Sequence, residues 1–366
     1  MSKLTIPISD PIRELHKIRK FKTLYFEEFM KGRFVGGNNV ELLQKKLSEK
    51  LGCKYVVTTN SGTDALILSI NQLNLSEGDE VLVPSFTFFA TIEAILHFKL
   101  KPVFVDIDDE TLTVDKQSFF DNITSKTKAF LPVHLFGKVF FNKQILDYCN
   151  KNNIKIVEDV AQAFGTKFDD RFLGNFGELG AFSLFPSKTL GGIGDGGFIT
   201  TNSIIYFKEL SKIKNHGQED LYSHDIMGVN SRLDSMNAFT LLKKLEIFDS
   251  IENSRKNLYN FFIKNIYNIN LKLPQFNQYE VPNYFSILLN SNRDNFVNHL
   301  QKKGIATNIY YPKCIHQQKA LRGVNYGFKS LKKSEKVSKK IVSIPFFAFM
   351  KKEEKERIVD ALNTFK

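Results

Sequence analysis

Short apolar runs alternate with helical stretches between residues 50 and 205. The runs are rich in β-branched and aromatic residues, and they predict seven strands at 55–58, 80–83, 102–105, 129–133, 155–158, 180–183 and 197–200. This alternation is typical of a parallel α/β sheet. Several runs end at a polar or glycine-rich turn, and open α/β sheets collect ligands at the carboxyl ends of their strands.

The pattern changes after residue 234. One long amphipathic helix is predicted from Ser235 to Ser254 or beyond, with an apolar face formed by Met236, Phe239, Leu242, Leu245 and Ile247. An apolar run at 281–289, a helix near 294–303 and a last helix over 351–365 follow. We therefore predict an α/β protein with a mostly parallel sheet in a large domain, residues 1–245, and a smaller C-terminal α+β domain, residues 246–366.

Composition limits the classes of function. The 366 residues are 42% hydrophobic and 25% charged, without an apolar leader or a run of about 18 apolar residues, so we expect a cytoplasmic protein and no membrane contact. The net charge of +12 is spread in short lysine clusters that do not alternate with aromatic residues, and no nucleic-acid partner is expected. Cys53, Cys149 and Cys314 are far apart and form no metal-binding pair, so we predict reduced cysteines and no metal site.

A single lysine stands between an apolar strand and a glycine run. In the segment 180–197, Lys188 follows the run that ends at Ser183 and precedes five glycines. A lysine in such a place can lose enough hydration to become a nucleophile toward an aldehyde, as a Schiff base with pyridoxal phosphate requires. A solvated loop lysine is the alternative reading.

Two strand ends carry groups that suit the same cofactor. Gly62 and Thr63 follow a strand and open a helix, where free amides favour a phosphate, although Ser61 or Thr63 can also be an ordinary N-cap. Asp159 ends a buried strand, and its charge needs a cationic partner such as a protonated pyridine nitrogen. The alternative is a surface strand end with two solvated acids, Glu158 and Asp159.

Two further residues, Ser183 and Phe88, suit the same cofactor but are weak signals when each is taken alone. Ser183 can supply a hydroxyl to a phosphate, and Phe88 can lie flat on a heteroaromatic ring. Each also has a plain reading, as a strand-end hydroxyl and as a core phenylalanine.

Eight motifs in order resemble one family. They are NSGTDALILSI, VPSFTFFATIEAI, PVFVDID, PVHLFGK, VEDVAQAFG, GAFSLFPSKTLGGIGDGGFITTN, KNHGQ and GVNSRLDSMNAF. Together they cover roughly residues 25 to 350, and they are similar to the nucleotide-sugar aminotransferases of the DegT/StrS group. The resemblance implies aminotransferase fold type I, pyridoxal 5′-phosphate as the cofactor, L-glutamate as the amino donor and a homodimer with shared active sites.

The resemblance also assigns residues. It implies that Lys188 binds the cofactor covalently and that Asp159 holds the proton of the pyridine nitrogen. The remaining cofactor contacts that it implies are Gln162 on the phenolic oxygen, Gly62, Thr63 and Ser183 on the phosphate, Phe88 on the ring, and Asn230 reaching the phosphate of the neighbouring subunit. Its substrate contacts are His216, Arg232, Tyr310 and Tyr311.

The same resemblance bears on the substrate. The segments 216–218 and 228–234 are similar to those of enzymes that aminate carbon 3 of UDP-linked 2-acetamido-3-oxo hexoses, for surface glycan or lipid A synthesis. Tyr310 stands where uronic-acid relatives have histidine, which favours a neutral hexose. A dTDP-3-oxo-6-deoxyhexose 3-aminotransferase is the alternative. Lys188 argues against a family dehydratase, in which histidine replaces it, and a regulatory protein with a retired catalytic domain is the remaining reading.

Overall fold

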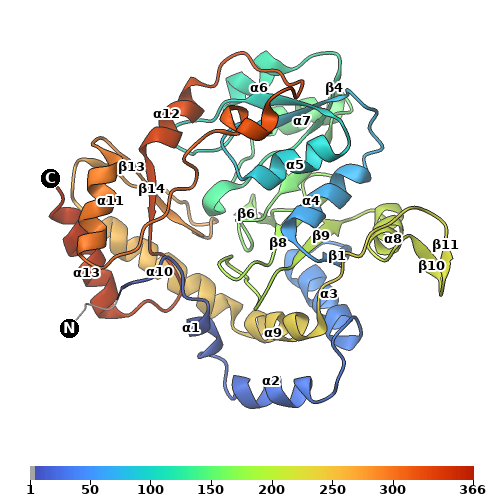
Figure 1. Ribbon diagram of the computed structural model, residues 1–366, viewed down its shortest axis with the longest axis horizontal. Helices are drawn as coiled ribbons and strands as arrows, with labels where there is room; N and C mark the ends of the chain where they lie inside the picture. Colours follow the sequence, from blue (N-terminus) through green and yellow to red (C-terminus); the bar gives the residue numbers. More distant parts are fainter. Residues whose placement is uncertain (1–4) are drawn as a thin grey trace.

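A seven-stranded sheet forms the centre of the computed structural model, which describes residues 5–366 (Figure 1). The strand order is β1-β9-β8-β5-β4-β2-β3. The bounds are β1 Tyr55–Thr59, β2 Glu80–Pro84, β3 Lys101–Val105, β4 Thr127–Phe130, β5 Lys155–Asp159, β8 Leu179–Ser183 and β9 Gly197–Thr201. All neighbouring pairs are parallel except those of β9, which runs antiparallel to β1 and β8. The predicted mostly parallel α/β sheet is confirmed.

Helices make up much of the remaining chain. Their bounds are α1 Ile12–Leu15, α2 Phe21–Phe29, α3 Asn38–Leu51, α4 Gly62–Asn71, α5 Phe89–His97, α6 Lys116–Asn122, α7 Lys143–Lys151, α8 Ile204–Ile213, α9 Ser235–Glu246, α10 Phe248–Asn265, α11 Arg293–Lys302, α12 Lys332–Lys340 and α13 Lys352–Asn363. Short 3-10 turns occupy Leu135–Gly137, Ile315–Gln317 and Lys319–Leu321. Within the described residues, no helix is long and apolar enough to cross a membrane.

The single helix expected from Ser235 onward is two helices. Ile247 lies between α9 and α10 with φ −111° and ψ 11°, outside helical values, so the axis changes direction there. Both α9 and α10 bury apolar residues at the same helical spacing. The sequence pattern therefore shows no sign of the break between them.

A second, smaller sheet lies in the C-terminal part. It has the order β12-β13-β14, with bounds Leu271–Lys272, Phe285–Leu289 and Ile341–Ile344, and its neighbours are antiparallel. This sheet packs with α10, α11 and α13 around its own apolar core. Ile6 belongs to that core and pairs with Ile305, so the N-terminal segment also covers the second sheet. The boundary between residues 245 and 246 stays a prediction; it falls one residue before the end of α9 at Glu246.

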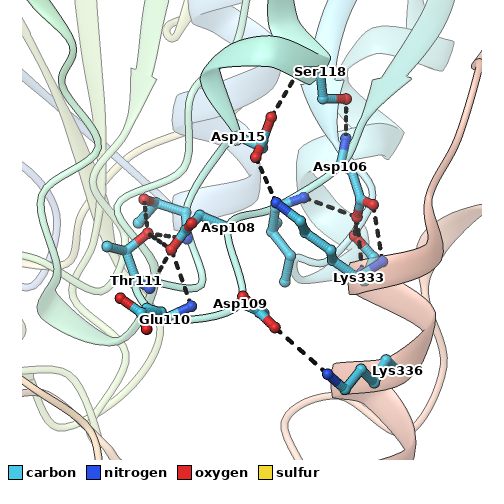
Figure 2. Close-up of polar contacts among 12 residues, drawn as sticks. Asp106, Asp108, Asp109, Glu110, Thr111, Asp115, Ser118, Lys333 and Lys336 are labelled. Carbon is cyan, nitrogen blue, oxygen red and sulfur yellow. Dashed lines mark hydrogen bonds and ion pairs between the residues drawn. The ribbon is translucent and has the colours of Figure 1, made fainter.

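Carboxylates at the end of β3 hold the first turn of α12 (Figure 2). Asp106 accepts hydrogen bonds from the Lys333 amide at 2.9 Å, and from the Ser334 amide and hydroxyl at 2.8 and 2.6 Å. The Lys333 ammonium donates to Asp115 at 2.7 Å. A carboxylate at a helix N-terminus satisfies free amides and favours the helix dipole. Asp106 therefore joins the large sheet to the second domain.

A narrow arm follows α8. It contains the hairpin of β10 Gln218–Asp220 and β11 Ser223–His224, which projects away from the sheet (Figure 1). Apolar side chains are highly exposed at its tip, Leu221 and Tyr222, and on the segment that follows it, Met227.

Candidate active site

One cavity of about 440 Å³ lies at the carboxyl ends of the central strands. Most of the predicted site residues line it: Gly62, Thr63, Phe88, Asp159, Gln162, Ser183, Lys188, Tyr310 and Tyr311. They come from four different strand ends and from the C-terminal domain, which is why they are distant in sequence. The topology brings them together because β1, β2, β5 and β8 run in the same direction, so their carboxyl ends lie at the same edge of the sheet.

Lys188 and Asp159 share the floor of this cavity. Burial lowers the pKa of Lys188 to about 8, and the charge of Asp159 acts in the opposite direction. The part of the Lys188 side chain that remains exposed faces the cavity. A lysine with this pKa is partly neutral near pH 8 and can act as a nucleophile or a base. A solvated loop lysine does not fit this environment.

Asp159 is 5% exposed at the end of β5. Burial raises its pKa, and hydrogen bonds from the Ala161 amide and the Thr91 hydroxyl, at 3.1 and 2.8 Å, partly offset that effect. In the described chain, no cation lies within 4 Å of its carboxylate. The surface reading of Glu158 and Asp159 is therefore wrong, and Asp159 presents a buried acceptor to the cavity.

Glu158 points to the other side of β5 and is fully buried. Its oxygens accept from the amides of Gly174, Phe176 and Gly177 at 2.8, 2.6 and 2.9 Å. His134 Nε2 lies 3.4 Å from the same carboxylate. These contacts give the buried Glu158 carboxylate hydrogen-bond donors, and they fix the strand end that carries Asp159.

The opposite end of the cavity is the N-terminus of α4. Ser61 is the N-cap, since its hydroxyl accepts from the Asp64 amide at 3.0 Å. In residues 5–366, the amides of Gly62 and Thr63 donate to no acceptor. A Cβ on Gly62 would lie 2.7 Å from the Cβ of Ser183, so only glycine permits this approach of α4 to β8. Two free amides, a hydroxyl and the helix dipole can hold a phosphate here.

Aromatic side chains form the walls. Phe88 is 55% exposed, which excludes the core reading, and its ring lies 6.0 Å from that of Tyr311. Gln162 is fixed between two partners: its Oε1 accepts from the Phe136 amide at 2.9 Å, and its Nε2 donates to the Tyr311 hydroxyl at 3.0 Å. Burial raises the pKa of the Tyr311 hydroxyl, which therefore stays neutral.

Two residues of the site were not assigned from the sequence. Thr91 donates to Asp159, and the ring of Tyr284 lies 5.8 Å from the Lys188 ammonium. Thr91 follows Thr87 by one helical turn, and the two hydroxyls are 3.0 Å apart, a spacing that could have suggested a pair. Tyr284 stands in an apolar run with no signal of its own.

Three predicted site residues lie outside the cavity. His216, Asn230 and Arg232 belong to the arm after α8 or to its base, and none of them lines the cavity of its own chain. The neighbouring Ser231 hydroxyl donates to Asp64 at 2.6 Å, which anchors this segment near the start of α4. The assignments of these three residues require a second copy of the chain and stay predictions.

Comparisons with known proteins identify a family. The DegT/DnrJ/EryC1/StrS aminotransferase family model matches residues 16–363. The chain is 35% identical over 331 residues to a UDP-N-acetyl-3-dehydro-α-D-glucosamine 3-aminotransferase of Acidithiobacillus ferrooxidans, covering 90% of this chain and 89% of the relative. It is 34% identical over 336 residues to a dTDP-3-amino-3,6-dideoxy-α-D-galactopyranose transaminase of Aneurinibacillus thermoaerophilus, covering 91% and 92%.

A solved structure of Bacillus subtilis NtdA with bound pyridoxamine phosphate superposes with a TM-score of 0.90. The identity is 28%, and the match covers 99% of this chain and 85% of the NtdA chain.

Proposed function

The chain belongs to the DegT/DnrJ/EryC1/StrS aminotransferase family, and from that premise we propose that it aminates carbon 3 of a nucleotide-linked 3-oxo hexose, with pyridoxal 5′-phosphate as cofactor and L-glutamate as donor. The observation that carries the proposal is that Lys188 and Asp159 line one cavity with free helix amides at its far end. The product, a 3-amino sugar, would serve surface glycan or lipid A synthesis.

The cavity fits the cofactor at each polar position. The Gly62 and Thr63 amides with Ser183 suit its phosphate, the buried Asp159 carboxylate suits its protonated ring nitrogen, and Lys188 suits its aldehyde. Gln162 Nε2 has one hydrogen beyond the bond to Tyr311, which can reach the phenolic oxygen. Phe88 would cover one face of the ring.

When bound, the cofactor supplies an aldehyde for the amine and a ring that withdraws electrons from the reacting carbon. Lys188 Nζ would bond that aldehyde first and, once displaced, move the proton to and from the reacting carbon. Asp159 would keep the proton on the ring nitrogen, because its buried carboxylate gains a cationic partner there. Tyr311 would remain neutral and orient Gln162.

We favour UDP-2-acetamido-3-oxo-2-deoxyglucose as the substrate. The name of the Acidithiobacillus relative supports the UDP sugar, and the transaminase of Aneurinibacillus supports the alternative, a dTDP-3-oxo-6-deoxyhexose. Tyr310 and Tyr311 would contact the sugar from the cavity wall. His216 and Arg232 would contact the substrate from the partner subunit, and Asn230 would reach the cofactor's phosphate.

A homodimer follows from the same proposal. The site residues on the arm are displaced from their own cavity, and apolar side chains on α2 and the arm are exposed, including Phe26, Met30 and Met227. We also propose a cytoplasmic location, since Cys53, Cys149 and Cys314 are free and buried.

The proposal is tested by a single turnover. The protein loaded with pyridoxamine phosphate is mixed with UDP-linked 3-oxo-N-acetylglucosamine, with dTDP-linked 3-oxo-6-deoxyhexose or with a 4-oxo sugar, and the absorbance of the lysine-bound cofactor is followed. We expect its return with the UDP sugar. A response to the dTDP sugar alone supports the alternative, and a response to the 4-oxo sugar alone contradicts both. Lys188→Ala should abolish turnover in both half-reactions and keep the fold.

A further inference from the structure

Three charged side chains meet in the interior behind the site. Glu14 of α1, Lys244 of α9 and Arg255 of α10 are 3%, 1% and 3% exposed. The Glu14 carboxylate pairs with the Lys244 ammonium, and Arg255 Nη2 lies 3.9 Å from the same carboxylate. Figure 1 shows α1 beside the region where α9 and α10 meet. The N-terminal segment thus places one carboxylate between two buried cations.

Both cations also reach backbone near Lys188. Lys244 Nζ donates to the carbonyl of Gly191 at 2.6 Å. Arg255 Nη1 donates to the carbonyl of Asn283 at 3.2 Å, and the side chain of Asn283 accepts from the Thr189 hydroxyl at 3.3 Å. Thr189 directly follows Lys188, so the loop 189–191 is held from two directions by groups that lead back to Glu14.

The loop 189–191 is closely packed against its neighbours. A Cβ on Gly191 would lie 2.4 Å from the Pro186 carbonyl oxygen, and Asn237 binds the amide of Ile193 at 3.0 Å. A shift of the Gly191 carbonyl would therefore be transmitted to the turn that carries Lys188 rather than absorbed locally.

Glu14 supplies the negative charge of this group of three side chains. In the part of the chain that the structure describes, no other carboxylate pairs with Lys244 or Arg255. Removing Glu14 would leave two like charges buried together, which favours movement of the Lys244 ammonium away from the loop.

We propose that Glu14 is a positioning residue for Lys188, acting through Lys244 and Arg255 to hold the loop 189–191 and thereby the reactive amine. This inference rests on the proposed cofactor. It adds the N-terminal helix α1, which does not line the cavity, to the machinery that binds pyridoxal phosphate.

The test uses equilibrium binding of pyridoxal phosphate to the full-length protein, together with thermal unfolding without cofactor. Glu14→Gln should weaken binding about tenfold, the scale of one lost buried hydrogen bond, and lower the melting temperature. The double variant Glu14→Gln/Lys244→Met has the same net buried charge as the natural protein. Its melting temperature should recover, while its cofactor binding stays weak because Gly191 has lost its donor.

Two further variants complete the design. Thr189→Val removes only the link to Asn283 and should weaken binding with little change in melting temperature, so it decides the matter if the Glu14 variants do not fold. Glu356→Gln breaks an exposed pair with Lys352 and should match the natural protein. Unchanged cofactor affinity in Glu14→Gln or Thr189→Val overturns the inference. Failure of the natural protein to bind pyridoxal phosphate would instead overturn the proposed function.

Discussion

At the scale of single residues, burial shifts the pKa values of Lys188 and Asp159, and the attraction between the two charges opposes both shifts. Burial lowers the pKa of Lys188 and raises that of Asp159, while their mutual attraction shifts both in the opposite sense. The lowered pKa of Lys188 makes a neutral amine available near pH 8.

This pair predicts a pH dependence for cofactor attachment. Lys188 bonds an aldehyde only when neutral, and with a pKa of about 8 the neutral fraction is about one tenth at pH 7 and rises through pH 8. The rate at which the cofactor-free protein combines with pyridoxal phosphate should therefore rise with pH, with a midpoint near 8, in stopped-flow absorbance. Asp159→Asn should move the midpoint to lower pH, because the carboxylate raises the Lys188 pKa. A midpoint near that of free lysine would contradict the assigned environment.

Gly62 predicts a defect limited to the phosphate. In Gly62→Ala the new methyl group would push α4 away from Ser183, since the Cβ atoms would lie 2.7 Å apart. We expect the affinity for pyridoxal phosphate to fall about tenfold, as for one or two lost charge-assisted hydrogen bonds. Affinity for pyridoxal, which lacks the phosphate, should hardly change. Gly194→Ala is the matched control, because nothing lies within 4 Å of its added Cβ. Equal losses for both ligands would argue against a phosphate site at α4.

At the scale of elements, strands were easier to predict than side-chain partners. Strands buried on both faces need continuous apolar residues. For this reason the predicted ends lie within a residue or two of the observed ends for β1, β2, β3, β5, β8 and β9. Lys188 and Asp159 were predictable because strand ends in such a sheet collect ligands. The break at Ile247 was not, since both flanking helices keep the same period.

Other parts of the site depend on contacts that no local pattern records. Tyr284 reaches the cavity from the second sheet, and Glu14 meets partners more than two hundred positions later in the chain. His216, Asn230 and Arg232 were assigned by resemblance alone, and a single chain does not test them.

The junction of β3 and α12 predicts a stability defect. In Asp106→Asn, an NH₂ group takes the place of one carboxylate oxygen. The backbone amide of Lys333 or of Ser334 then loses its acceptor. We expect the free energy of unfolding to fall by about 2–3 kcal/mol in urea titrations. Asp109→Asn, which loses only a 3.6 Å contact with the exposed Lys336, should change it by less than about 0.5 kcal/mol. Equal effects of the two variants would show that Asp106 does not join the domains as described.

At the scale of the whole molecule, the proposed site is divided between two chains. The cavity holds the reactive pair and the phosphate amides, whereas Asn230 and Arg232 stand on the segment beside the projecting arm. A monomer would then keep a cofactor pocket without its complete set of ligands.

Hybrid dimers test this division. Lys188→Ala and Arg232→Ala should each abolish most activity, but one chain of each kind reconstitutes one intact site. Random mixing by joint refolding should restore about one quarter of the natural activity, since half of the dimers carry one of two sites. Assays before and after mixing measure the gain. No recovery in a mixture shown to exchange subunits would place Arg232 in its own chain's site or outside the reaction.

The pairing of Ile6 with Ile305 and of Glu14 with Lys244 has a consequence for biosynthesis. During synthesis Glu14 cannot meet Lys244 until about 230 more residues have been made, which takes about 10 to 50 s at usual elongation rates. During this delay Glu14 has no partner, while the strands of the central sheet, which all precede residue 202, are already available to fold. If Glu14 positions Lys188 as proposed, a nascent chain should bind pyridoxal phosphate weakly until Lys244 has left the ribosome.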